Sequence, residues 1–363
     1  MRIESVRTLY VAAGGGGDAV GTLLARRLLE SIGGEPALIS TCAWERLRID
    51  PVPGPRSRSD FVGLRSVGGV RAEVVPTSDT LPAGRSVLPR LAGDVDARIF
   101  VHDFTGGAVG LADQLRALAN SVGAESLTVV DVGGDVVAHG GERGLLSPLA
   151  DSLTLAASIR TGLSVRLAIL GPGVDGELTA NDVTKILRHL RAERIGVVTP
   201  DDVAALHDVL VWHPTEATTL AAAAALGHRG AVDMRRGLEP VPLLDDSAAV
   251  WVLDSPDPAS FPLASALMQT RSLVSAERIM RDVAVDELDY ERRRATQRNS
   301  QPPAESTSVV VEASRHQGAT FITTRRLLET GTTDLLSLET ARVDGLGLWD
   351  LDELAASAVT TRH

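Results

Sequence analysis

The chain has 363 residues, with 36 Lys and Arg against 47 Asp and Glu, which gives a formal net charge of −11. An acidic chain with only 3% aromatic residues is poorly suited to binding phosphate backbones or stacking bases, so we expect no nucleic-acid partner. The single cysteine excludes an intramolecular disulfide framework and a cysteine-rich metal site. The sequence shows no membrane-length apolar run and no signal-peptide pattern, so we expect a cytoplasmic protein without a membrane partner.

Short apolar runs alternate along the chain with helical patterns. The strand-like runs are Thr8–Ala13, Ala37–Cys42, Arg98–Phe104, Leu127–Val132, Val165–Leu170 and Ala248–Leu253. The helical stretches between them include Ala19–Ser31, Leu111–Val122, Leu149–Ile159 and Ala180–Ala192. Most of these strands lack polar alternation, as strands buried on both faces do. The pattern predicts a Rossmann-like α/β fold, with an open, mostly parallel sheet and helices on both faces.

Three segments depart from this alternation. Residues 44–94 are rich in proline and glycine and predict a long excursion containing a short strand at Ala72–Val75. Residues 286–307 are charged and then rich in Gln, Asn, Ser and Pro, which is typical of a mobile linker. We therefore expect an α/β ligand-binding core at 1–285, then the linker, and a C-terminal appendage at 308–363 that packs on the core.

The appendage is expected to contain a strand at Ser308–Ala313 and helices at Thr323–Thr330 and Trp349–Ala358. It could add an edge strand, cover the sheet or form the contact of a homodimer.

Four consecutive glycines, 14–17, follow the first predicted strand and precede a helix. Glycine permits a tight turn, and a helix N-terminus favours anions. The spacing to Gly21 departs from the dinucleotide fingerprint, and residues 40–42 (Ser-Thr-Cys) stand where that fold usually has an acid. A tight turn that permits close packing is the alternative to ligand binding. We assign an anionic or polar ligand to Gly15, Gly16 and Gly17.

Acidic residues recur after the predicted strands, each beside glycines. Because parallel strands end at one edge, where doubly wound sheets bind ligands, we expect these acids to line one cleft. Turn formation is the alternative, since Asp and Gly are common in turns. The candidate catalytic residues are Asp135, Asp175, Asp103, Glu177 and the nearby His139. The candidate ligand-binding residues are Asp18, Gly133, Gly134 and Gly173, together with the three glycines above.

Clustered carboxylates and an anion-binding loop make opposite demands on a ligand, and three arrangements are open. A divalent cation such as Mg²⁺ would bridge carboxylates and a phosphate. The acids would instead bind hydroxyls or an amine. A crowded carboxylate would have a raised pKa and act as a general acid or base.

We expect an enzyme of the hydrolase or lyase type that acts on a small polar metabolite, for example one that is phosphorylated or nucleoside-like. One alternative is an enzyme that depends on a nicotinamide or S-adenosylmethionine cofactor. The other is a regulatory module that binds a ligand without turning it over.

Four motifs occur in order along the chain: GGGGD at 14–18, DVGGD at 131–135, SPLAD at 147–151 and GPGVDGE at 171–177. Together they resemble the family catalogued as domain of unknown function 1152, over roughly residues 5–330. The resemblance implies that these loops belong to one α/β domain. It implies no activity and no catalytic residue.

Overall fold

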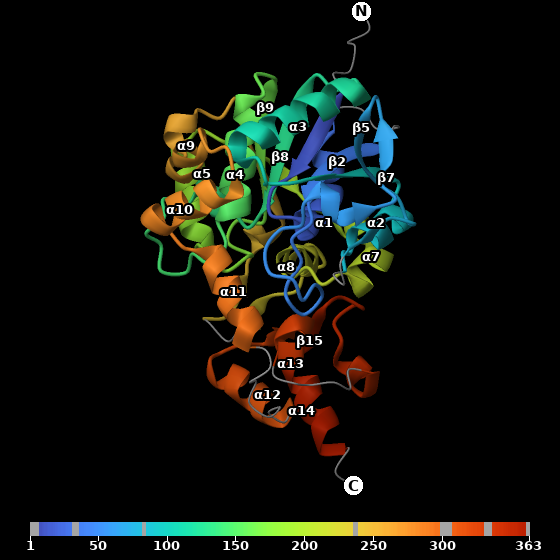
Figure 1. Ribbon diagram of the computed structural model, residues 1–363. Coiled ribbons are helices and arrows are strands. Elements are labelled where there is room, and N and C mark those ends of the chain that lie inside the picture. The colour runs from blue at the N-terminus through green and yellow to red at the C-terminus, as the bar shows by residue number, and fades with distance from the viewer. Residues whose placement is uncertain are drawn as a thin grey trace, which may run out of the picture.

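The computed structural model describes residues 7–30, 36–81, 85–234, 239–297, 307–329 and 336–360. Figure 1 shows a large α/β body, coloured blue to orange, and a smaller C-terminal part, coloured orange to red, beside it. None of the helices in these ranges has the length and apolar character needed to cross a membrane.

The body is built on a nine-stranded sheet with the order β10-β13-β9-β8-β1-β2-β7-β5-β4. Its five central strands are parallel: β1 (Thr8–Ala12), β2 (Ala37–Cys42), β7 (Ala97–His102), β8 (Ser126–Val132) and β9 (Ser164–Leu170). Antiparallel strands extend both edges: β4 (Arg65–Val67), β5 (Val70–Val74), β10 (Glu193–Val197) and β13 (Ala249–Asp254). The predicted strands and the mostly parallel α/β class are thus confirmed.

The chain reverses its direction of winding at the centre of this sheet. It proceeds outward from β1 through β2 to β7, and then returns to place β8 on the other side of β1, followed by β9. The loops that leave β1 and β8 therefore diverge toward opposite sides. In doubly wound sheets this divergence opens the crevice in which ligands bind.

Helices cover both faces of the sheet because its strands are apolar on both sides. In β1, Leu9 and Val11 pack into one core, while Tyr10 and Ala12 pack into the other. The first core is covered by α3 (Gly107–Val122), α4 (Leu149–Arg160), α9 (Pro262–Leu267) and α10 (Leu273–Val283). The second is covered mainly by α1 (Gly16–Leu29) and α8 (Ala217–Ala225). Burial of apolar side chains on both faces stabilises the arrangement.

The proline-rich excursion returns to the sheet instead of leaving it. After η1 (Arg58–Asp60), the short strands β3 (Phe61–Val62) and β6 (Asp79–Thr80) pair with each other, while β4 and β5 form the edge hairpin beside β7. Buried Glu73 in β5 accepts hydrogen bonds from Arg65 and Arg98. These two guanidinium groups lower the pKa of Glu73 to about 2, although its burial opposes the shift. The excursion then ends in α2 (Leu88–Asp94).

The C-terminal part shares a second sheet with the body. This four-stranded sheet has the order β12-β11-β14-β15, from β11 (Gly230–Asp233), β12 (Val241–Leu243), β14 (Phe321–Thr323) and β15 (Leu348–Asp350). Two of these strands precede β13 in the chain, so the appendage completes a sheet that the body begins. The helices here are α12 (Thr307–His316), α13 (Thr324–Glu329) and α14 (Leu351–Thr360).

One predicted element of the appendage is wrong. The run Ser308–Ala313 is rich in valine and was expected to be a strand, but it lies within helix α12. Val310, Val311 and Ser314 recur at helical spacing and are buried, and the two valines pack into the small C-terminal core. Burial of this face outweighs the β preference of valine.

Several shorter elements connect these parts. The segment expected to be a linker begins with helix α11 (Glu287–Gln297), and residues 298–306 lie outside the described residues. Between β9 and α8 come α5 (Ala180–His189), α6 (Pro200–Ala204) and α7 (His207–Trp212).

Candidate functional site

The loops at the winding reversal bring three aspartates together. Asp18 lies in the first turn of α1, Asp131 lies at the end of β8, and Asp151 lies in the first turn of α4. One carboxylate oxygen from each lies within 4.8 Å of the others. Because oxygen ligands at such spacing suit a divalent cation, these three residues could hold one.

Further acids surround this trio and line a cavity of about 140 Å³. Asp135 begins the short helix η2 (Asp135–Val137), while Asp175 and Glu177 follow β9. All three are at most 6% exposed. Four of the predicted acids, Asp18, Asp135, Asp175 and Glu177, therefore line one pocket, as the convergence of strand ends required.

Arg46 and Arg325 line the pocket, but neither forms an ion pair with the aspartates at its centre. Within the described ranges, no arginine, lysine or histidine forms an ion pair with Asp18, Asp131, Asp135 or Asp151. Asp18 and Asp131 accept backbone hydrogen bonds, for example from Gly14 to Asp18 at 2.8 Å. The side chains of Asp135 and Asp151 have no hydrogen-bond partner in that part of the chain.

Burial and mutual repulsion raise the pKa values of these groups. Burial is the main cause for Asp151, and the charges of Asp131 and Asp18 add to it. Burial, followed by the charges of Asp151 and Glu177, likewise raises the pKa of Asp135. Burial raises the pKa of Asp131 to about 7, against two backbone hydrogen bonds that lower it. Buried carboxyl groups whose pKa values are raised in this way are typical of acid–base sites.

Two of the predicted acids also build the walls of the pocket. Glu177 accepts hydrogen bonds from the backbone N–H groups of Leu146 and Ser147, at 2.7 and 2.9 Å, and from the Ser147 hydroxyl. It thereby fixes the loop that leads into α4 and Asp151. Asp175 packs against Gly133, where a Cβ would lie 2.3 Å from the Asp175 Cγ. Gly133 has φ +121°, which also favours glycine.

The glycine loop serves both packing and the pocket. A Cβ at Gly16 would lie 3.1 Å from Val87, and one at Gly17 would lie 3.0 Å from the Thr215 hydroxyl. Close packing therefore accounts for these two glycines, although both also line the cavity. The Gly14 N–H at the start of the loop binds the Asp18 carboxylate instead of facing outward to an anion.

The other predicted glycines shape turns. Gly15, Gly134 and Gly173 all have positive φ, and none of the three lines the cavity.

The remaining two candidates lie outside the cavity. Asp103 follows β7, where its carboxylate accepts hydrogen bonds from the N–H groups of Arg58 and Thr105. His139 is 58% exposed, and its Nδ1 lies 3.5 Å from Glu142. The structure therefore does not bring Asp103 or His139 to the carboxylates.

Sequence reasoning did not select several residues that line the pocket, among them two aspartates, a glutamate and a histidine. Asp131 and Asp151 lie in quoted motifs but were not assigned roles. Glu287, on α11, lies in the expected linker, and its burial together with the nearby Glu291 raises its pKa to about 8. His213 follows α7 and is 4% exposed.

A contact with the backbone fixes which ring nitrogen of His213 carries the proton. Its Nδ1 accepts a hydrogen bond from the N–H of Thr215 at 3.3 Å, so Nε2 carries the proton. This Nε2 is buried and has no hydrogen-bond partner in the described part of the chain. A Cβ at Gly16 would lie 3.8 Å from it. Burial lowers the pKa of His213 to about 3, so a neutral donor lies beside the glycine loop.

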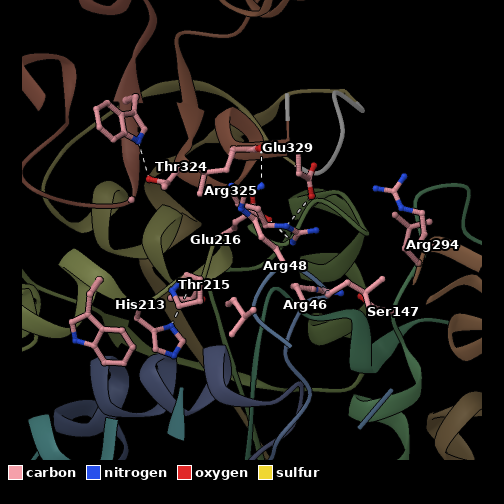
Figure 2. Close-up of a pocket in the computed structure, with 18 of the residues that line it drawn as sticks. Arg46, Arg48, Ser147, His213, Thr215, Glu216, Arg294, Thr324, Arg325 and Glu329 are labelled. Atoms are coloured by element: carbon pink, nitrogen blue, oxygen red, sulfur yellow. Dashed lines mark hydrogen bonds and ion pairs between the residues drawn. The ribbon is translucent and has the colours of Figure 1, made fainter. Parts of the chain in front are cut away.

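A larger cavity of about 660 Å³ adjoins the carboxylate pocket. The two share lining residues, among them Arg46, Ser147 and His213. Figure 2 shows these three around its floor, with Thr324, Arg325 and Glu329 of the C-terminal part on the opposite side. The carboxylate pocket thus lies at the inner end of a composite site.

A family model described as "Protein of unknown function (DUF1152)" matches residues 9–295. The chain belongs to this family. The match includes every residue of the carboxylate pocket discussed above and excludes the C-terminal helices and β14 and β15. No curated protein and no solved structure matches the chain.

Proposed function

We propose that this DUF1152 protein is an enzyme that acts on a small polar metabolite by acid–base chemistry of the hydrolase or lyase type. One observation supports the proposal above all others. Four carboxyl groups without a cationic partner in the described ranges meet in a buried pocket at the winding reversal of the sheet. Unbalanced buried charge costs stability, and such costs are concentrated at functional sites.

The trio of Asp18, Asp131 and Asp151 would hold a divalent cation such as Mg²⁺. Three carboxylate ligands leave coordination positions for water or substrate, which Mg²⁺ commonly retains. The hydrogen bond from Gly14 directs the Asp18 carboxylate toward the start of the loop. A cation would supply the missing positive charge and position a water or a substrate oxygen.

Asp135 would transfer the proton. It lies outside the trio, is 5% exposed and lines the same pocket. Because its side chain has no hydrogen-bond partner in the described part of the chain, it is available to a substrate hydroxyl or water. Asp175 would orient the same hydroxyl, since it lines the same pocket from the loop after β9 and its charge adds to the repulsion that raises the Asp135 pKa.

The proposal is tested by turnover of a panel of phosphorylated and nucleoside-like metabolites, with and without MgCl₂. For any substrate found, Asp135→Asn should reduce kcat by about 10² to 10⁴-fold while substrate binding is retained. Asp113→Asn, at an exposed position on α3, is the matched control and should keep the full rate. Turnover by Asp135→Asn at the wild-type rate would overturn the proposal.

A further inference from the structure

The larger cavity has the size of a ligand site. Its volume of about 660 Å³ falls within the usual range for small-molecule sites, roughly 300–1,000 Å³. The carboxylate pocket alone, at about 140 Å³, holds only a few atoms of a ligand. A substrate that filled only the inner pocket would leave most of the composite site empty.

The wall of this cavity comes from two parts of the chain. The loop after β2 and helix α11 contribute one side, including Arg48 and Arg294. The C-terminal part contributes the other, from Thr324 to Trp349. This second wall lies beyond the residues that match the family model, which end at 295. The appendage therefore encloses a site whose chemical end belongs to the family domain.

Much of the lining is apolar or aromatic. Leu47, Leu146, Val211 and Leu328 contribute aliphatic groups, and Trp212 contributes an indole ring. The guanidinium group of Arg90 lies 4.1 Å from the centre of the Trp212 ring and holds it in place. Such a surface binds the apolar body of a ligand by excluding water.

Five arginines lie among these apolar groups, and two are held by carboxylates. Arg325 donates to Glu216 at 2.7 Å and to Glu329 at 3.1 Å, and Arg342 donates to Glu339 at 3.0 Å. Their charges are therefore balanced within the protein.

Arg48 and Arg294 differ from these pairs. Arg48 donates one N–H group to the backbone oxygen of Leu328 at 3.0 Å and forms no ion pair within the described ranges. Arg294 has no hydrogen-bond or ion-pair partner in that part of the chain. In Figure 2 Arg48 is drawn close to Glu216, whereas Arg294 is drawn further to the right, beyond Ser147. Both guanidinium groups remain available to an anion.

We infer that the larger cavity binds the apolar, anionic part of an elongated substrate whose hydroxyl- or amine-bearing part reaches the carboxylate pocket. The inference rests on the proposed function for the chemistry at the inner end. The two cavities differ in the groups that they offer a ligand. Four aspartates without an ion-pair partner in the described ranges line the inner pocket, whereas the outer cavity, which also holds five glutamates, offers two arginines that form no ion pair in those ranges. The anionic group is a carboxylate or a phosphate, which arginine binds with the same geometry.

Two fluorescent probes test the cavity. 8-Anilinonaphthalene-1-sulfonate has an aromatic body with an anionic group, and N-phenyl-1-naphthylamine has nearly the same body without the charge. We expect the folded protein to bind both with one-to-one stoichiometry. Arg48→Gln and Arg294→Gln should each weaken binding of the sulfonate by about tenfold, the loss of one charge-assisted hydrogen bond, and leave the amine unaffected.

The glutamine variants keep the test independent of folding. Glutamine at position 48 retains an N–H group for the Leu328 oxygen, and the melting temperature of each variant is measured alongside. Arg71→Gln, at an exposed position on β5 outside the cavity, is the matched control and should bind both probes as the wild type does. Equal sulfonate affinity in the wild type and in both cavity variants would overturn the inference, as would a wild type that binds neither probe.

Competition between the sulfonate and small anions identifies the chemical class of the anionic group. Displacement of the sulfonate by phenyl phosphate at lower concentration than by benzoate would assign a phosphate, and the reverse would assign a carboxylate.

One further variant separates this inference from the proposed function. Asp135→Asn should lose turnover and keep its sulfonate affinity. If Asp135→Asn retains turnover but the arginine variants lose affinity, only the proposed function fails; the opposite pair of results refutes only this inference.

Discussion

The crowding of carboxylates makes a prediction about stability that needs no substrate. Replacing Asp151 with Asn removes one charge from a trio whose oxygens lie within 4.8 Å of one another. Two unit charges at this distance repel by about 3.5 kcal/mol at an effective dielectric constant of about 20. The wild type avoids part of this cost by holding a proton in the cluster. We therefore expect Asp151→Asn to stabilise the cation-free protein by about 1–2 kcal/mol.

The assay is thermal and urea unfolding in EDTA near neutral pH. For a chain of this length the gain corresponds to a rise in Tm of about 2–4 °C. Asp113→Asn, which removes an exposed carboxylate with 70% of its side chain accessible, is the control and should shift Tm little. If Asp151→Asn lowers the stability in EDTA, the three carboxylates do not repel one another and the reasoning is refuted.

Three further predictions concern stability and the shape of the pocket. Burial lowers the pKa of His102 from 6.5 to about 3, so the folded protein keeps it neutral while the unfolded chain binds a proton below about pH 6.5. As the pH falls from about 6.5 to about 3, this difference should lower the free energy of unfolding by about 1.4 kcal/mol per pH unit. Urea titrations of His102→Asn should lack this slope. Glu73→Gln should cost about 2–3 kcal/mol near pH 7, a difference that shrinks as the pH falls from about 4.5 toward 2 in the same titrations. Gly133→Ala should cost at least about 2 kcal/mol and displace Asp175, with loss of turnover.

Each of these has an outcome that contradicts it. The same pH slope in His102→Asn and the wild type would show that His102 is protonated in the folded protein. If the loss of unfolding free energy in Glu73→Gln is undiminished at pH 2, the ion pairs of Glu73 are not its cause. Gly141→Ala is the matched control for Gly133→Ala, since a Cβ at Gly141 meets no atom within 4 Å. Equal melting temperatures for these two alanine variants would show that the Gly133 turn tolerates a side chain.

The central sheet could be predicted because its signal is local. Leu9 through Ala12 form a short run of largely apolar residues that ends at a glycine turn, which is typical of a strand buried on both faces. The orientation of β13 could not be predicted in this way, since an apolar run is the same in a parallel and an antiparallel strand. The structure shows β13 antiparallel to β9. The direction of a strand depends on its pairing with strands that are distant in the sequence, and a local sequence pattern does not reveal that pairing.

The candidate site was predicted in part for a related reason. Asp18, Asp135 and Asp175 follow strands that share one edge, so the parallel sheet implies their convergence. Asp151 lies in a helix, and its proximity to Asp18 depends on how α4 packs. Asp103 follows a strand as well, but β7 is separated from β1 by β2, and its end lies away from the winding reversal. Position along the sheet, which the sequence does not state, therefore distinguishes the acids that meet from those that do not.

The most direct test of the account is calorimetric titration of Mn²⁺ and Mg²⁺ into protein freed of metal by EDTA. We predict that the wild type and Asp113→Asn bind one divalent cation per chain, and that Asp151→Asn, with the trio reduced to two carboxylates, binds none in the same range. Equal stoichiometry and affinity in the wild type and Asp151→Asn would contradict the claim that the carboxylate pocket is the functional centre of this protein.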